Sequence, residues 1–263
     1  MTSDQSEHNR HSLRLDGHTA LVTGATGTIG AVIAETLAAA GASVIAHCRD
    51  DAARLDPLLE RIAAAGGNCV AVAADLCEEQ EVAALFDELD ARDLCADRIV
   101  NNAALQTVTA FNRLSVDEWR SMMRVNLDAA FQITRLAAER LAGAGGGAIV
   151  NIGSIEGQDP APAHGHYSTS KAALTMLTRA AAQELGPVGL RVNAVSPGLI
   201  DRDGLAEDWP EGVDRWREKA PLGRLGRASD VAGAVLFLLS PAADWISGAN
   251  LVVDGGMSSV SRW

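Results

Sequence analysis

The feature that most constrains the fold is a regular alternation of short apolar runs with longer amphipathic stretches. The apolar runs read as strands, at 18–24, 42–47, 68–75, 97–104, 147–154, 190–196 and 250–256. The stretches between them read as helices, at 28–40, 51–65, from about residue 78, 115–142, 166–186 and 229–239. Strands that are apolar on both faces and are each followed by a helix form a parallel sheet covered on both sides. The sequence therefore predicts a three-layer α/β fold.

The pattern continues along the chain without a linker or an internal repeat. A chain of 263 residues fits one α/β domain, which we expect to span 13–263. Residues 1–12 are polar and lack the apolar segment of a signal peptide, so we expect a disordered tail there. Residues 199–221 interrupt the alternation with charged residues, Pro, Gly and two tryptophans. A connection of that length favours a substrate lid.

Composition disfavours several classes of partner. The formal net charge is −12, without a block of basic residues, which disfavours nucleic acid and anionic membrane surfaces. No apolar run approaches the ~20 residues that span a bilayer. The cysteines form no CxxC pair and no cluster with histidine, so we expect reduced thiols in a cytoplasmic protein and no metal site.

A glycine-rich turn, TGATGTIG at 23–30, follows the first predicted strand and opens the first helix. Gly24, Gly27 and Gly30 would let the backbone turn tightly and approach a pyrophosphate at the helix N-terminus. A plain strand–helix connection would explain the glycines alone. The position at the first strand–helix junction favours a dinucleotide site.

The end of the second predicted strand bears on which dinucleotide binds. An acid there would bind the ribose 2′-hydroxyl of NAD, but this chain has His47, Cys48 and Arg49. The guanidinium of Arg49 suits a 2′-phosphate. Asp50 and Asp51 follow directly and weaken this argument, and a solvated Arg49 is the alternative. The sequence favours NADP(H) over NAD(H).

Tyr167 and Lys171 stand one helical turn apart in YSTSK and share a helix face. An ammonium there should lower the pKa of the phenol from about 10 toward the working range. Ser154, at the end of the fifth predicted strand, could bind a substrate oxygen beside the tyrosine. The pattern indicates an enzyme that moves a proton on and off an alcohol or carbonyl oxygen.

Several motifs together give a resemblance to the short-chain dehydrogenase/reductase family, from Leu13 to Gly256. They are TGATGTIG, Asp75–Leu76, NNAA at 101–104, Asn126 in MRVNLDAAF, Ser154, YSTSK, RVNAVSPG at 191–198 and DGG at 254–256. The resemblance implies a Rossmann-like fold with strand order 3-2-1-4-5-6-7 and a homotetramer or homodimer. It also implies a catalytic tetrad of Asn126, Ser154, Tyr167 and Lys171.

The resemblance and the turn together predict a set of cofactor contacts. These are Gly24, Thr26, Gly27, Thr28, Ile29, Gly30, Arg49, Asp75, Leu76, Asn102, Ala103, Tyr167, Lys171, Pro197, Gly198 and Ile200. Two positions depart from the family pattern. Thr28 stands where its commonest turn, TGxxxGxG, has a glycine, and Arg202 stands where a threonine often follows the PG pair.

The residues expected near the substrate say less about function than those expected near the cofactor. Side chains that could face a substrate are Gln106, Glu156, Gln158, His164, His166, Arg202, Trp209 and Trp216. Their polarity favours a small polar molecule that is interconverted between secondary alcohol and ketone. The alternatives are an NAD-dependent sugar or polyol dehydrogenase and a reductase of 3-oxoacyl groups on acyl carrier protein. A nucleotide-binding protein without turnover is the alternative from another class.

Overall fold

The seven predicted strands form one parallel sheet in a computed structural model that describes residues 12–261. The strands are β1 (Thr19–Val22), β2 (Ser43–Cys48), β3 (Asn68–Ala73), β4 (Arg98–Asn101), β5 (Gly147–Ile152), β6 (Leu190–Pro197) and β7 (Asn250–Val253). Their order is β3-β2-β1-β4-β5-β6-β7, which confirms the predicted topology. The predicted tail falls almost wholly on residues 1–11, outside the described residues.

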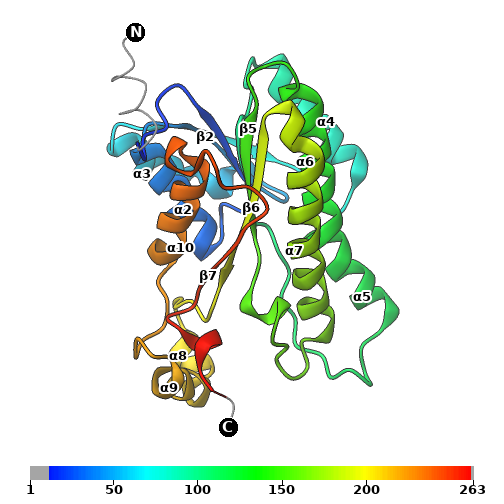
Figure 1. Cartoon of the computed structure of the whole chain (residues 1–263), viewed down its shortest axis with the longest axis vertical. Coiled ribbons are helices and arrows are strands. Elements are labelled where there is room, and N and C mark those ends of the chain that lie inside the picture. The colour runs from blue at the N-terminus through cyan, green and yellow to red at the C-terminus, as the bar shows by residue number, and fades with distance from the viewer. Residues whose placement is uncertain (1–11, 262–263) are drawn as a thin grey trace.

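Helices cover both faces of the sheet (Figure 1). One face carries α2 (Thr28–Ala39), α3 (Asp56–Ala64) and α10 (Ala228–Leu239). The other carries α4 (Glu79–Ala91), α5 (Val116–Met123), α6 (Ala129–Leu141) and α7 (Gly165–Leu185). Short 3₁₀ turns lie between these elements and after the last strand: η1 (Ala52–Leu55), η3 (Ile155–Gly157), η4 (Gly186–Val188), η5 (Pro241–Ala243) and η6 (Met257–Ser259).

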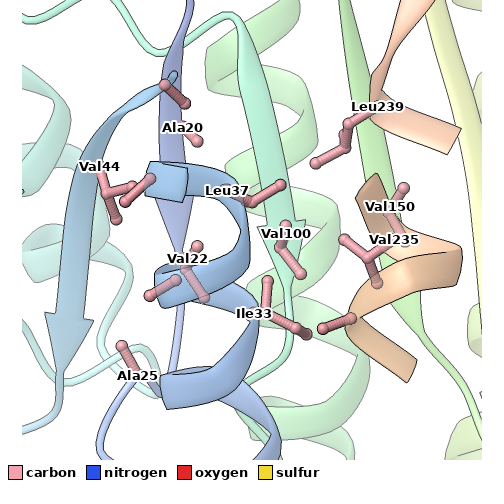
Figure 2. Packing of buried hydrophobic residues seen from close by; sticks show 14 of the residues in the cluster. Ala20, Val22, Ala25, Ile33, Leu37, Val44, Val100, Val150, Val235 and Leu239 are labelled. Carbon is pink, nitrogen blue, oxygen red and sulfur yellow. The ribbon is translucent and has the colours of Figure 1, made fainter. Parts of the chain in front are cut away.

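Each face of the sheet has its own apolar core, because successive strand residues point to opposite sides. Ala20 and Val22 of β1 belong to the cluster under α2 and α10, whereas Leu21 belongs to the cluster under α4 and α6. Figure 2 shows the first cluster, in which Ile33 of α2 and Val235 of α10 lie against the strands. This packing fixes the strand ends that carry the site.

The predicted helix at 115–142 is interrupted. The structure has α5, a π-helical segment η2 (Arg124–Asp128) and then α6. Ser115 begins α5 with a reciprocal capping box to Glu118. Asn126 lies inside η2 and is buried, so the extra residue of the π turn falls on a predicted site residue. The predicted helix at 51–65 likewise begins as the 3₁₀ turn η1.

The segment 199–221 contains two short helices, α8 (Leu205–Asp208) and α9 (Pro210–Lys219). They lie beyond the sheet, at the end where α7 begins (Figure 1). Leu205, Val213 and Leu225 form a small apolar cluster within and just after this segment. Within residues 12–261, no helix is long and apolar enough to cross a membrane.

Candidate active site

The glycine-rich turn connects β1 to α2 and is held by Asn102. Gly24 has φ +65°, a conformation that favours glycine. Asn102 Nδ2 donates to the carbonyl oxygens of Thr23 (2.8 Å) and Gly24 (3.1 Å). A side chain at Gly30 would collide with the Gly24 carbonyl and the Asn102 amide, whereas one at Gly27 would meet only ordinary contacts. Gly24 and Gly30 therefore shape the turn, and Gly27 leaves its outer side open.

The open side of the turn suits an anion. Thr26, Gly27 and Thr28 are exposed, and within the described chain no side chain caps the N-terminus of α2. The first N–H groups of a helix and its dipole attract phosphate. The residues present therefore fit the pyrophosphate of a dinucleotide.

His47 supports the same turn, a role that sequence reasoning missed. Its side chain is buried at the end of β2. Nδ1 accepts from the Gly24 N–H (3.3 Å), so Nε2 carries the proton and donates to the Ala74 carbonyl (2.9 Å). Burial lowers the pKa of His47, which keeps the ring in this neutral form. The only sequence signal was a histidine within an otherwise apolar strand.

Beyond β2, the two acids that follow Arg49 have nearer partners than its guanidinium. Asp50 pairs with Arg54 at 3.0 Å, and Asp51 caps η1 by accepting from the Ala53 N–H. Arg49 lies farther from Asp50, at 3.7 Å, and its side chain is 66% exposed. The guanidinium therefore forms only a long, solvent-exposed contact with Asp50.

The predicted adenine contacts have structural partners of their own. Asp75 Oδ1 accepts from the Cys77 N–H (2.9 Å), as a turn residue does. Leu76 is buried in the core beneath α4. Asn102 holds the turn, and Ala103 N donates to Thr23 Oγ1 (3.0 Å). Cofactor contact at these positions stays a prediction.

Ser154, Tyr167 and Lys171 gather where β5 ends and α7 begins. A hydrogen bond joins the Tyr167 and Ser154 side chains, and Lys171 Nζ lies 5.7 Å from the tyrosine ring centre. Lys171 Nζ also donates to the carbonyl oxygen of Ile152 (2.8 Å). Tyr167 and Lys171 are both buried, at 8% and 3% exposure. The structure thus brings three of the four predicted tetrad residues together.

The predicted lowering of the tyrosine pKa is wrong for this structure. Burial raises the pKa of Tyr167 to about 12; the Ser154 hydrogen bond opposes this rise, and the nearby Glu156 carboxylate adds to it. Lys171 is itself buried, and that burial lowers its pKa to about 8. Because burial disfavours the ammonium form of Lys171, that side chain cannot strongly stabilise the phenolate of Tyr167. Sequence spacing showed the pair but not the desolvation of both members.

Asn126, the fourth predicted tetrad residue, anchors a loop. Its Oδ1 accepts from the Leu105 N–H (2.8 Å), while its Nδ2 lies within hydrogen-bond distance of the Leu105 carbonyl (2.9 Å) and Ser170 Oγ (3.0 Å). Ser170 lies on α7 beside Lys171. A small cavity lined by Asn101, Asn126 and Lys171 has room for about one water molecule.

The predicted substrate residues lie in different surroundings, and two of them are placed beside Tyr167. Glu156 and His164 form a half-buried pair at 2.9 Å, and the His164 ring meets Tyr167 edge-on. Gln106 is exposed, and Arg202 pairs with Asp208 at 2.9 Å within the 199–221 segment. Trp209 is 47% exposed. The structure thus places Glu156 and His164 next to the tyrosine.

Two other aromatic or imidazole candidates take structural positions. His166 is fully buried, and its Nε2 is 2.8 Å from Thr107 Oγ1. Trp216 of α9 packs against Gly198, where an added Cβ would lie 2.8 Å from its ring. This contact joins the 199–221 segment to the predicted nicotinamide segment of Pro197, Gly198 and Ile200. Among residues 12–261, no three His, Cys, Asp or Glu side chains are placed to hold a metal ion.

Comparison with known proteins agrees with this arrangement. The family model described as enoyl-(acyl carrier protein) reductase matches residues 24–258. The 7alpha-hydroxysteroid dehydrogenase of Escherichia coli K12 is 37% identical over 250 residues, which cover 94% of this chain and 97% of that protein. The chain belongs to the short-chain dehydrogenase/reductase family. It is therefore an oxidoreductase of the class that acts on CH–OH groups.

Other family members are similar over the same length. Galactitol 2-dehydrogenase (L-tagatose-forming) of Cereibacter sphaeroides is 37% identical over 255 residues, 94% of this chain and 97% of that protein. A crystal structure of a gluconate 5-dehydrogenase from Burkholderia cenocepacia J2315, in complex with NADP and tartrate, matches with TM-score 0.90 and 32% identity. It covers 96% of this chain and 99% of that one. The family thus includes steroid and sugar dehydrogenases at similar distances from this chain.

Proposed function

We propose that this protein interconverts a secondary alcohol and a ketone on a small polar substrate, with Tyr167 as general acid and base. The observation that carries the proposal is the group formed by the buried Tyr167 and Lys171 with the partly buried Ser154, at the carboxyl end of β5. In a parallel α/β sheet, ligands bind at this end of the strands. The nucleotide turn after β1 opens at the same end.

The residues divide the work of the reaction. The nicotinamide of a bound cofactor supplies or accepts the hydride. Ser154 donates a hydrogen bond to the substrate oxygen and stabilises charge that develops there. Tyr167 gives its proton to that oxygen in reduction and takes one in oxidation. Lys171, whose pKa is about 8, gains and loses a proton near neutral pH beside the phenol.

The protonation states of Tyr167 and Lys171 predict how the rates of reduction and oxidation depend on pH. Because burial raises the pKa of Tyr167 to about 12, its hydroxyl is protonated at pH 7 and is ready to donate. Ketone reduction should therefore be favoured near neutrality, and alcohol oxidation should accelerate as the pH rises through the range where Lys171 loses its proton. We also propose that a water in the cavity between Asn126 and Lys171 relays this proton.

We propose NADP(H) as the preferred cofactor. Support comes from the exposure of Arg49 at the end of β2, where its contact with Asp50 is long (3.7 Å) while Asp50 pairs more closely with Arg54 and Asp51 caps η1. The similar gluconate 5-dehydrogenase was crystallised with NADP. Replacing Arg49 with Ala should lower kcat/KM for NADP at least tenfold and leave that for NAD nearly unchanged.

The control for this change is Arg61→Ala, which removes another exposed arginine, paired with Glu35 on the neighbouring helix. It should change neither value. A tenfold preference of the unmodified protein for NAD would refute the proposed preference.

The test of the activity itself is a substrate panel with both cofactors, followed by the absorbance of the reduced nicotinamide. It should contain polyols, aldonates, sugars, hydroxysteroids and 3-oxoacyl thioesters in both directions. A 3-oxoacyl group on acyl carrier protein is a weaker candidate, because an acidic carrier would meet a protein of net charge −12. Absence of any absorbance change would favour a nucleotide-binding protein without turnover.

We propose that residues 199–221 form a lid and that the protein is a homotetramer or homodimer. The contact of Trp216 with Gly198 supports the lid, because a movement of α9 would change the packing of the predicted nicotinamide segment. Exposed Phe131 of α6, Met176 of α7 and Trp245 support the second, since large apolar side chains are commonly covered by partner copies. Light scattering that shows a monomer at micromolar concentration would contradict the assembly.

A further inference from the structure

Glu156 and His164 form an acid–imidazole pair beside the tyrosine. His164 Nδ1 lies 2.9 Å from Glu156 Oε2 and 3.1 Å from Oε1, and both side chains are only 16% exposed. Ser168 Oγ donates to the same carboxylate at 3.2 Å. Two fixed partners therefore hold Glu156, and Glu156 in turn holds His164.

The pair lies on the same short stretch as the proposed catalytic hydroxyls. The backbone N–H of Glu156 donates to Ser154 Oγ (3.1 Å). The His164 ring lies edge-on to Tyr167, with ring centres 6.1 Å apart and planes at 74°. A group bound by His164 would thus lie a short distance from the oxygen bound by Ser154 and Tyr167.

One ring nitrogen of His164 has a hydrogen-bond partner, and the other has none among the described residues. A carboxylate only accepts hydrogen bonds, so Nδ1 carries the proton, and Nε2 of the neutral ring is an acceptor. Within residues 12–261, Nε2 has no hydrogen-bond partner, and it is not sealed from solvent. His47 is the contrast, because both of its ring nitrogens are bonded to the backbone.

This difference indicates a binding role rather than a structural one. Removing a carboxylate and an imidazole from water costs free energy, which hydrogen bonds at both ends of each group would offset. Orienting Nδ1 toward a fixed carboxylate while leaving Nε2 accessible presents a directed acceptor. Metal sites and active sites orient histidine in this way.

We propose that His164, oriented by Glu156, accepts a hydrogen bond from a second hydroxyl group of the substrate, on a carbon next to the one that is oxidised. The inference rests on the proposed function and narrows it to vicinal diols such as polyols and aldonates. Substrates with an isolated hydroxyl, such as hydroxysteroids, would leave the acceptor unpaired. Sites built to bond a hydroxyl reject analogues that lack it by large factors.

The test compares the best polyol or aldonate of the panel with its deoxy analogue, which lacks the hydroxyl next to the reacting carbon. The unmodified protein should favour the diol by at least 100-fold in kcat/KM. His164→Phe, which keeps a ring but removes the acceptor, should lower kcat/KM at least 30-fold for the diol. It should change kcat/KM for the deoxy analogue less than threefold.

Glu156 is proposed as a positioning residue and needs a separate readout. Glu156→Gln keeps an oxygen that accepts from Nδ1, so it should retain most of the preference for the diol. Glu156→Ala should lose it, mainly through a rise in KM. The matched control is His18→Phe, because His18 also bonds a carboxylate through Nδ1 (Asp97 Oδ2, 2.6 Å) but lies at the opposite end of the sheet. It should leave the preference unchanged.

The affinity of each variant for NADPH, measured by fluorescence, shows whether the fold is intact. An unmodified protein that prefers an isolated hydroxyl would overturn the inference. So would a His164→Phe variant whose kcat/KM falls equally for both substrates. Either result leaves the proposed dehydrogenase activity standing. A panel without any turnover would refute the proposed function and this inference with it.

Discussion

Replacing Lys171 with Met should remove a free-energy penalty that the folded protein carries at neutral pH. The side chain is 3% exposed, and burial lowers its pKa from 10.5 to about 8. Because each pH unit of difference corresponds to ~1.4 kcal/mol, holding the ammonium in the folded state costs about 3 kcal/mol at pH 7. Methionine has a similar length and no charge, so it fills the site without this cost.

The sign of the pH dependence follows from the lowered pKa. Between pH 8 and 10.5 the unfolded chain binds the proton and the folded chain has lost it, so the penalty decreases as pH rises. From pH 7 to pH 9.5 the unmodified protein should gain about 2 kcal/mol relative to Lys171→Met. The lost hydrogen bond to Ile152 shifts the variant by a constant and leaves this difference untouched.

The assay is urea unfolding at several pH values and one protein concentration, with the difference between the two proteins taken at each pH. Subtraction removes the titration of the cysteines, which both proteins share. A difference that stays constant within 0.5 kcal/mol, where about 2 kcal/mol is expected, would refute the argument that Lys171 is a desolvated lysine.

Two further predictions concern the nucleotide turn. Gly30→Ala should destabilise the protein by ~1–3 kcal/mol, because its methyl group would meet the Gly24 carbonyl, whereas Gly27→Ala at the open position should be nearly neutral in thermal melts. Equal melting temperatures for the two variants would contradict the turn geometry. His47→Phe removes the hydrogen bond from the Gly24 N–H, so the Kd for NADPH should rise about tenfold, corresponding to ~1.4 kcal/mol. An NADPH affinity within twofold of the unmodified value would show that His47 does not support the turn.

The sequence predicted the sheet well because the five central strands are mostly buried. Runs such as 18–24 and 190–196 are apolar enough to read as parallel strands, and the strand order followed from a resemblance carried by several motifs. The π turn at Arg124–Asp128 was missed, since an extra residue in a helix leaves the apolar periodicity almost intact. The sequence pattern thus predicted the order of strands and helices but not the irregular turn within a helix.

The sequence predicted which candidate residues lie together better than it predicted their electrostatics. Spacing placed Tyr167 and Lys171 on one helix face, which the structure shows. The direction of the tyrosine pKa depended on burial by distant elements and could not be read from spacing. The hydrogen bond of His47 to Gly24 and the pairing of Glu156 with His164 likewise join residues whose proximity depends on the folded backbone.

The most direct test of the central claim is the turnover of Tyr167→Phe, measured with the best substrate of the panel together with the Kd for NADPH. Phenylalanine keeps the ring and its packing but removes the hydroxyl that we propose as the proton donor and acceptor. We predict that the Kd stays within about twofold, while kcat falls by ~10²–10⁴, the usual contribution of a general acid or base. Retention of more than about a tenth of kcat, set against that expected loss, would contradict the assignment of Tyr167 as the proton donor and acceptor.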